Sequence, residues 1–350
     1  MKMRMTQLKT IADIQTGPFG SQLHKEDYVE TGTPIVTVEH LGNRVFTEQN
    51  LPRVSDSDKA RLIKYTLSTG DIVFSRVGSV DRCSYVDKSH DGWMFSGRCL
   101  RVRPTELVDS LYLYYYFCLE ETKQFVRNIA VGATMPSINT KLLGEVEIAL
   151  PDLNNQKRIA AVLSSLDDKI ENNQKLNDNL ADLLQTIYQG RFGNDILAVN
   201  QGVLSDICSY STDKVAVSEL NVRTYFSTEN MLSGKAGSTE ATSLPTTSQT
   251  TACHKGDTLI SNIRPYFKKI VYCEDKCGCS TDVLCFTPSQ PCYSAYLFST
   301  LYADKFFAFM VAGSKGTKMP RGDKQQIMTY PVVLPVSYTH LRAHETGAYL

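Results

Sequence analysis

The sequence has 350 residues, of which 42% are hydrophobic and 21% charged, and its 37 basic residues balance 37 acidic ones. This composition is typical of a globular protein long enough for two domains. A net charge of zero argues against a protein that holds nucleic acid by bulk electrostatics, because each phosphate contact needs a cation. No apolar run approaches the ~20 residues that cross a bilayer, and the N-terminus lacks the apolar core of a signal peptide, so we expect a cytoplasmic protein without membrane contact.

The first 151 residues combine short β runs with one helical stretch near residues 110–131. Residues 17–20 (GPFG) predict a tight loop whose amides can approach a phosphate, with Ser21, His24 and Lys25 beside it. A plain turn between strands is the open alternative. Residues 70–75 (GDIVFS) predict a turn followed by a buried strand, and residues 132–136 (GATMP) predict a second loop.

Residues 152–190 predict a long helix without an internal proline. The helix carries a seam whose spacing alternates four and three, and the seam consists of Ile159, Leu163, Leu166, Ile170, Asn173, Asn177, Leu180, Leu184 and Ile187. Seven of these nine residues are apolar, which favours a coiled coil over the wider apolar stripe of an ordinary bundle helix, the open alternative. The two Asn residues favour a specific helix partner, because a buried Asn fixes register. At ~1.5 Å per residue, the helix measures roughly 55 Å.

The segment after this helix repeats the segment before it. Residues 256–261 (GDTLIS) match residues 70–75, residues 316–320 (GTKMP) match residues 132–136, and the ends of the two segments match as well. Ordered matches at a nearly constant offset predict two duplicated globular domains of the α+β class, with a mixed or antiparallel sheet in each. The predicted limits are 1–151 for the first domain, 152–192 for the spacer helix, 193–335 for the second domain and 336–350 for a tail outside the repeat.

No catalytic constellation emerges from the residues. Asp152 and Asp167 lie on one predicted helix ~22 Å apart, too far to share a metal ion. The sequence contains no phosphate-binding lysine loop. His24, His40, His90 and His254 form no HxxxH or HxH pair, and His340 and His344 fall in the tail after residue 335. Five Cys residues between 273 and 292 have spacings that match no common zinc knuckle, so buried free thiols are predicted and a zinc site is the alternative. We therefore predict a protein that is not an enzyme and holds no metal.

Cations and aromatic residues gather at equivalent places in the two copies, beside the GD turns and the GxxMP loops. Arg and Lys at such places neutralise phosphates or bind guanine edges, and Ser and Thr bind either. Solvated surface charge is the alternative interpretation. The predicted DNA-binding residues are Ser21, Lys25, Arg76, Arg82, Arg98, Arg101, Arg127, Thr134, Ser137, Lys141, Arg264, Tyr266, Lys268, Lys269, Lys315, Thr317, Lys318 and Arg321.

Two related domains joined by a coiled-coil helix resemble the DNA-specificity subunit of type I restriction–modification systems. The resemblance is carried by residues 8–21, the GDIVFSR strand at 70–76, the loop at 132–136 and the start of the spacer at 148–170, and it covers residues 6 to about 335. It implies that each domain, a target-recognition domain, reads one half of a split DNA target while the helix sets the gap. A self-sufficient enzyme, and a coiled-coil scaffold or anti-restriction decoy, are the competing hypotheses.

The resemblance also implies partners. Two methyltransferase subunits and the translocating restriction subunits dock on such a subunit, which has no cofactor of its own. S-adenosylmethionine, ATP and Mg²⁺ belong to those partners. The tail VSYTHLRAHETGAYL stands where the family continues into a second spacer helix, so we expect a truncated or frame-shifted end. The bases that the domains recognise do not follow from the sequence.

Overall fold

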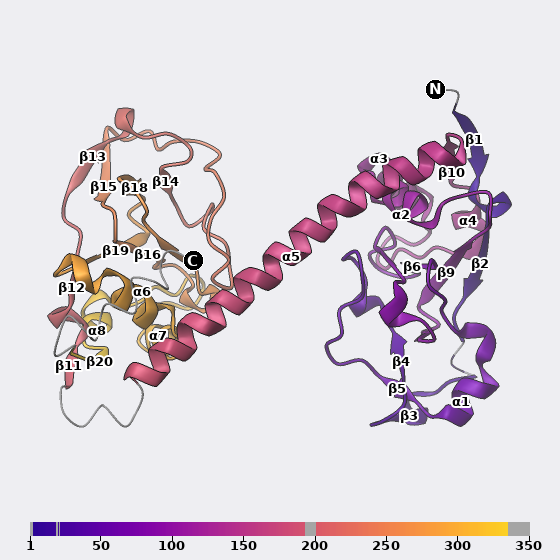
Figure 1. The fold of residues 1–350 in the computed structure, drawn as a ribbon, viewed down its shortest axis with the longest axis horizontal. Helices are drawn as coiled ribbons and strands as arrows, with labels where there is room; N and C mark the ends of the chain where they lie inside the picture. The colour runs from indigo at the N-terminus through magenta and orange to yellow at the C-terminus, as the bar shows by residue number, and fades with distance from the viewer. Residues whose placement is uncertain (1–2, 19, 21, 193–200, 335–350) are drawn as a thin grey trace. The chain divides into compact units, whose positions relative to one another are not determined.

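The computed structural model describes residues 3–18, 20, 22–192 and 201–334. The chain divides into two compact units, Met1–Asn172 (unit 1) and Asn173–Leu350 (unit 2), and each combines sheets with helices (Figure 1). The predicted α+β class, with two duplicated domains and a long helix, is confirmed. The division falls inside that helix, and the domain limits expected at 151, 192 and 335 stay a prediction.

Unit 1 is built on an antiparallel sheet with the strand order β2-β9-β6-β7. Its strands are β2 (Ala12–Thr16), β9 (Cys99–Pro104), β6 (Ile72–Ser75) and β7 (Cys83–Tyr85). Every residue of β6 is buried, as the GDIVFS pattern predicts. The terminal strands β1 (Arg4–Gln7) and β10 (Glu147–Leu150) form a separate antiparallel pair.

A second, smaller sheet completes unit 1, with the order β3-β5-β4-β8. Its strands are β3 (Tyr28–Val29), β5 (Arg53–Val54), β4 (Thr33–Val36) and β8 (Met94–Phe95), and β4 runs parallel to β8. The helices are α1 (Asp56–Arg61), α2 (Ser110–Cys118), α3 (Glu120–Ile129) and α4 (Thr140–Gly144). One apolar core joins the main sheet to α2, α3 and α4, and another lies around the smaller sheet.

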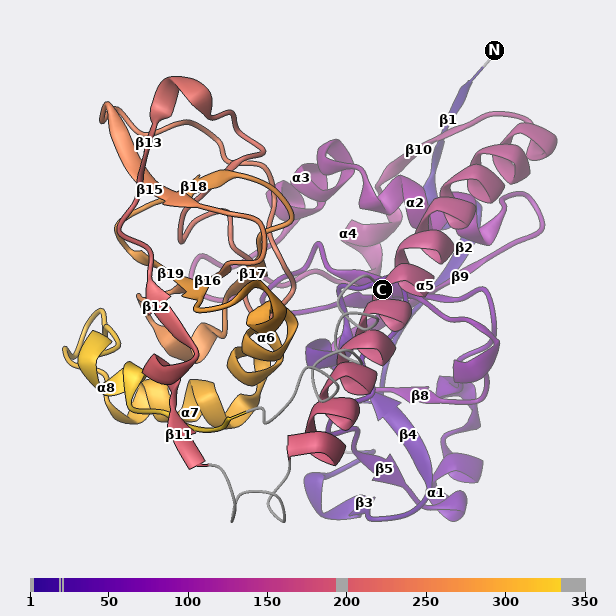
Figure 2. The ribbon, with the colours of Figure 1, turned by 60° about the vertical axis from the view of Figure 1, so that its left-hand side comes forward.

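Unit 2 repeats this plan (Figure 2). Its main sheet consists of β12 (Cys208–Tyr210), β19 (Val283–Pro288), β16 (Thr258–Ser261) and β17 (Ile270–Tyr272). The smaller sheet consists of β13 (Lys214–Ala216), β15 (Gln249–Cys253), β18 (Cys277–Cys279) and β14 (Tyr225–Phe226). The terminal pair is β11 (Gln201–Val203) with β20 (Pro331–Val333), and the helices are α6 (Ser294–Tyr302), α7 (Asp304–Ala312) and α8 (Lys324–Met328).

The repeat extends to individual hydrogen bonds. The carboxylate of Asp71 accepts from the amide of Ser68 at 2.8 Å, and that of Asp257 accepts from the amide of His254 at the same distance. Tyr112 donates its hydroxyl to the carbonyl of Ala149, and the equivalent Tyr296 donates to Val333. The internal repeat seen in the sequence therefore corresponds to two copies of one scaffold.

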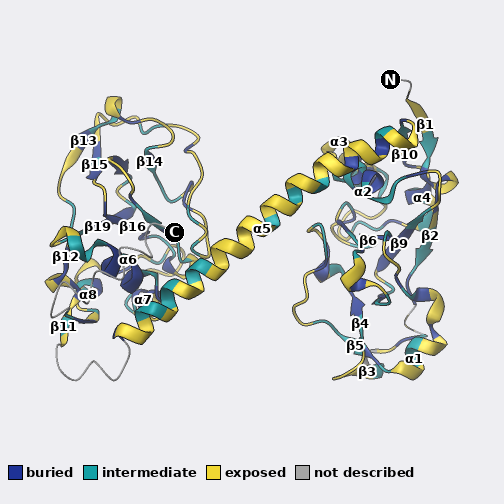
Figure 3. Cartoon of the chain, in the orientation of Figure 1, coloured by how far each residue is buried: buried dark blue, intermediate teal, exposed yellow. Residues whose placement is uncertain are grey.

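Helix α5 (Leu153–Phe192) is one continuous helix of 40 residues, or ~60 Å at the usual rise. Asp152 caps it by accepting from the amide of Asn155 at 3.0 Å, and this hydrogen bond lowers the pKa of the Asp152 carboxyl. The helix continues past Gly190, which was expected to end it. Most of α5 is exposed between its two ends (Figure 3). None of the helices in the described ranges combines the length and apolar character needed to cross a membrane.

Candidate nucleic-acid interface

The two GxxMP loops, residues 131–137 and 315–321, are closed at their bases in the same way. Val131 and Ser137 exchange two backbone hydrogen bonds of 2.9 Å each. Lys315 and Arg321 exchange the equivalent pair at 2.9 and 3.0 Å. Each loop is therefore a short, hydrogen-bonded projection whose middle residues face solvent, among them Thr134 and Thr317.

Each loop is also joined to the turn that follows the buried GD strand. The amide of Gly78 donates to the carbonyl of Pro136, and the amide of Arg264 donates to that of Pro320, both at 2.8 Å. Gly78 and Arg264 both have positive φ, at 77° and 51°. Glycine adopts this conformation freely, whereas a side chain is strained there by ~1 kcal/mol or more. Arg264 therefore occupies a strained position beside the loop of unit 2, and its buried Nε has no hydrogen-bond partner among the described residues.

Some of the predicted DNA-binding residues have side chains that are available to a ligand. Arg98, Lys141 and Lys318 are exposed, and in the described part of the chain no ion pair or hydrogen bond engages their side chains. Tyr266 is half exposed and lies against Phe267, with ring centroids 4.8 Å apart. With the two loop threonines, these residues form the accessible part of the predicted surface.

Other predicted cations are paired within the protein at the surface. Arg127 binds Glu120 and Asp81, and its hydrogen bonds to these two carboxylates raise the pKa of its guanidinium. The remaining pairs are Lys268 with Asp304, Lys315 with Asp323 and Arg321 with Asp282. Such exposed pairs contribute little to stability, about 0.2–1 kcal/mol, so a phosphate can replace the carboxylate partner at low cost. Their acidic partners were not part of the sequence prediction.

A further group of predicted residues donates to backbone carbonyls. Arg76 donates to Gly97 at 3.0 Å, Lys269 donates to Thr228 at 2.6 Å, and Ser137 donates to Val131 at 3.2 Å. Arg82 donates to the carbonyl of Leu41. Ser21 lies outside the described residues, and Lys25 is described only by its backbone, in the short 3-10 helix Lys25–Asp27.

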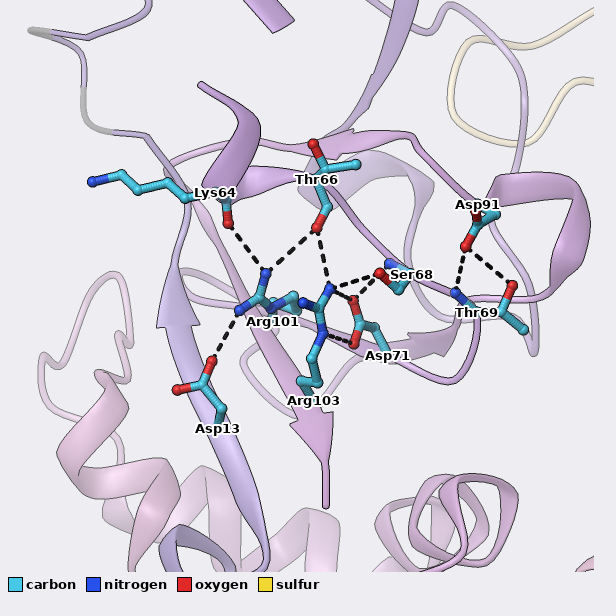
Figure 4. A network of polar contacts seen from close by, with 9 residues as sticks. All are labelled: Asp13, Lys64, Thr66, Ser68, Thr69, Asp71, Asp91, Arg101 and Arg103. Carbon is cyan, nitrogen blue, oxygen red and sulfur yellow. Dashed lines mark hydrogen bonds and ion pairs between the residues drawn. The ribbon is translucent and has the colours of Figure 1, made fainter. Parts of the chain in front are cut away.

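Arg101 has a structural role in unit 1 (Figure 4). It is only 5% exposed, and its guanidinium binds Asp13 at 2.9 Å and the carbonyls of Lys64 and Thr66. The neighbouring Arg103 donates twice to the buried Asp71, at 2.7 Å each, and these bonds raise the pKa of the Arg103 guanidinium. Arg101 and Arg103 alternate along β9 and so point to the same face of the sheet. Burial removes Arg101 from the surface that we expect to contact DNA.

The clustered cysteines of unit 2 are buried free thiols. Cys253, Cys273, Cys277, Cys279 and Cys285 belong to one core cluster, and the sulfurs of Cys273 and Cys277 are 3.5 Å apart. Within the described ranges, no group of three or more His, Cys, Asp or Glu residues is arranged to hold a metal ion. Burial raises the pKa of Cys208 in the same unit to about 12, as expected for a thiol that packs as a small apolar side chain.

The predicted seam of α5 is exposed over its first two thirds. Leu166 and Ile170 are 53% and 55% exposed, and Ile159, Leu163, Asn173 and Asn177 are also classed as exposed. Leu180, Leu184 and Ile187 are half-buried. Beside the seam, on the same helix, Gln156 and Ala160 are buried. An exposed apolar stripe of this kind is typical of a binding surface, and its pairing with a partner helix stays a prediction.

Comparison with known proteins assigns the family. The model of the type I restriction modification DNA specificity domain matches residues 2–181, just over half of the chain, so the chain belongs to this family. It is 37% identical over 89 residues to the MjaIX specificity subunit of Methanocaldococcus jannaschii, a match that covers 25% of this chain and 21% of that protein. It is 26% identical over 158 residues to the HindI specificity subunit of Haemophilus influenzae, covering 44% and 34%.

The same fold is found in a solved structure. The S subunit of a type I restriction-modification system from M. genitalium superposes with a TM-score of 0.66 at 17% identity, covering all of this chain and 89% of that one. The two curated relatives are each matched over about a third of their length or less.

Proposed function

We propose that this chain is a DNA-reading subunit of a type I restriction–modification complex, in which each unit reads one half of a two-part target. The observation that carries the proposal is the duplication. Both units hold a GxxMP loop against the turn after the GD strand through equivalent hydrogen bonds. Two copies of one scaffold can bind two half-sites, because each copy presents an equivalent surface that docks on the duplex in the same way.

In this proposal α5 sets the gap between the half-sites and its exposed seam docks the methyltransferase subunits. The chain itself catalyses nothing, and S-adenosylmethionine, ATP and Mg²⁺ are bound by the partner subunits, with the complex acting in the cytoplasm. A zero net charge agrees with this arrangement, because partners that surround the DNA supply most phosphate contacts.

The test is selection from a random duplex library, with and without the methyltransferase subunit of the same system. We expect recovery of a two-part motif with a fixed gap, at least in the presence of the methyltransferase. Absence of any enriched motif in both conditions would refute the proposal and favour a scaffold or decoy that reads no DNA.

A second arm tests the spacer. Insertion or deletion of seven residues near the middle of α5 is expected to change the gap and leave both half-sites unchanged, because a heptad restores the seam. Altered half-sites with an unchanged gap would show that α5 does not set the spacing.

A further inference from the structure

Unit 1 contains an apolar groove between the β1–β10 pair and the helices α2 and α3. Its volume is about 540 Å³, and its apolar walls are Met5, Tyr116, Leu119, Phe125 and Val146. Phe125 is 43% exposed and Met5 is 54% exposed, although both side chains are large and apolar. Large apolar side chains left in solvent around one concave site are typical of a binding surface.

The equivalent place in unit 2 is filled by the chain itself. Val146 and Tyr330 are equivalent, because their carbonyls accept from the amides of Leu8 and Leu204 at the same point of the fold. The ring of Tyr330 lies edge-on to Phe306 and Phe309, with centroids 5.2 Å away in both cases. Unit 1 has Thr122 where unit 2 has Phe306, at the same offset of 184 residues. The rings of Phe306 and Tyr330 in unit 2 therefore occupy the space that Thr122 and Val146 leave open in unit 1.

The rim of the groove is acidic in unit 1 only. Glu121, Glu145 and Glu147 line it and are exposed, and Lys9 is the one cation among the lining residues that the structure describes. The positions equivalent to the three glutamates in unit 2 hold Lys305, Thr329 and Pro331. Three carboxylates around an apolar site repel phosphate and attract Lys or Arg, which makes DNA an unsuitable occupant and a basic protein segment a suitable one.

We propose that this groove binds a segment of a partner protein that presents an aromatic side chain flanked by Lys or Arg. Tyr330 shows, within the same chain, that an aromatic ring fits between these elements. An aromatic anchor buries 150–250 Å², and anchors of this kind with charged neighbours commonly dominate binding energy. The inference goes beyond the proposed DNA reading and does not depend on it.

The experiment selects random peptides displayed on phage against the full chain. The counter-selection uses a Thr122→Phe/Val146→Tyr variant, which copies the filling of unit 2. We expect enriched peptides to carry Trp, Tyr or Phe next to Lys or Arg. An enriched peptide, labelled and followed by fluorescence anisotropy, is expected to bind the unmodified chain at least ten-fold more tightly than the filled variant.

Two further variants separate the apolar and charged parts of the site. Glu121→Gln/Glu145→Gln/Glu147→Gln is expected to weaken binding about ten-fold at low salt and to reduce its salt dependence. The matched control is Glu26→Gln/Glu30→Gln/Glu39→Gln, which removes the same charge from exposed positions near the smaller sheet and is expected to leave binding unchanged. Phe125→Ser tests the groove wall without adding volume, should the filled variant fail to fold by circular dichroism, and is expected to weaken binding at least five-fold.

The proposal is overturned if no peptide is enriched over the counter-selection, or if enriched peptides lack either the aromatic or the basic residue. It is equally overturned if Phe125→Ser binds as well as the unmodified chain, or if duplex DNA displaces the peptide from this groove. Enrichment of a two-part DNA motif by the same preparation reports on the proposed function separately.

Discussion

Arg44 and Asp168 form an ion pair of 2.5 Å that joins a loop of unit 1 to helix α5 across 124 residues of sequence. Arg44 also donates to Ser164 at 3.0 Å and lies 3.5 Å from Glu171. The adjacent residue, Asp167, accepts a hydrogen bond of 2.7 Å from the hydroxyl of Tyr115, and burial together with this bond raises the pKa of the tyrosine. The first half of α5 is thus fixed to unit 1 by polar contacts as well as by its buried Gln156 and Ala160.

Arg44→Met and Asp168→Asn, alone and combined, test this contact. Because Arg44 is mostly buried while Asp168 is exposed, we expect a coupling energy of about 0.5–1 kcal/mol in the double-mutant cycle. The measurement is scanning calorimetry of the transition assigned to unit 1. Lys169→Met, an exposed neighbour on the same helix, serves as the control and is expected to change stability little. A coupling energy indistinguishable from zero would contradict the assignment.

The sequence predicted the features that are encoded by a local pattern or that occur in both copies of the repeat. The GD strands and GxxMP loops were predicted because the same residues occur twice, and the structure places them in equivalent hydrogen bonds. The contact of Arg44 with Asp168 was not predictable, since no periodic pattern connects residues so far apart. The burial of Arg101 was missed because its partners, Asp13 and the carbonyls of Lys64 and Thr66, are distant in sequence and no local pattern connects them to it. The groove of unit 1 was not predicted either. It exists because Thr122 and Val146 carry no aromatic ring, whereas the equivalent Phe306 and Tyr330 of unit 2 do.

Arg98 and Arg101 are expected to behave oppositely on substitution. Arg98→Ala removes an exposed cation, so DNA affinity is expected to fall and the slope of log affinity against log salt to decrease by about 1, with an unchanged melting temperature. Arg101→Ala leaves the carbonyls of Lys64 and Thr66 without their donor, and we expect a loss of about 2 kcal/mol in stability. Calorimetry and filter binding over a salt series distinguish the two. Equal losses of stability in both variants would refute the distinction.

Substitutions in the exposed seam of α5 are expected to weaken binding to the methyltransferase subunit without affecting folding. Leu166→Gln/Ile170→Gln changes two side chains that are more than half exposed and keeps good helix formers, so helix content and melting temperature are expected to stay the same. Binding to the methyltransferase subunit is expected to weaken at least ten-fold, measured by sedimentation or calorimetric titration. Ala160→Gln, on the buried face, is the contrasting variant and is expected to destabilise unit 1. Undiminished binding by the seam variant would remove the seam from the interface.

The ion-paired carboxyl of Asp304 predicts that part of the stability of unit 2 depends on pH. Hydrogen bonds from Lys235 and Lys268, at 2.8 Å each, lower the pKa of its carboxyl from 3.8 to about 2. A carboxyl with a lowered pKa in the folded state contributes stability that is fully present above its unfolded value and lost as the pH falls. The melting-temperature difference between the unmodified chain and Asp304→Asn is therefore expected to shrink between pH ~4 and ~2. Because the carboxyl is mostly exposed, the difference is expected to be small throughout. When Lys235→Met and Lys268→Met are introduced into both proteins, the melting-temperature difference is expected not to change over this pH range. A difference that is already constant with pH when both lysines are present would contradict the pairing.

The positive φ of Arg264 predicts that this residue lowers the stability of unit 2 while its charge favours DNA binding. Its φ of 51° places a side chain where unit 1 has Gly78, and Asn tolerates this conformation better than Arg. Arg264→Asn is therefore expected to stabilise unit 2 by about 0.5–1 kcal/mol. The same change removes a cation next to the GxxMP loop, so DNA affinity is expected to fall five-fold or more. Gly78→Asn in unit 1 is the matched control, where only strain is introduced and stability should decrease. If Arg264→Asn binds DNA unchanged while stabilising the fold, the arginine takes no part in recognition, and strain at this position has no functional reason.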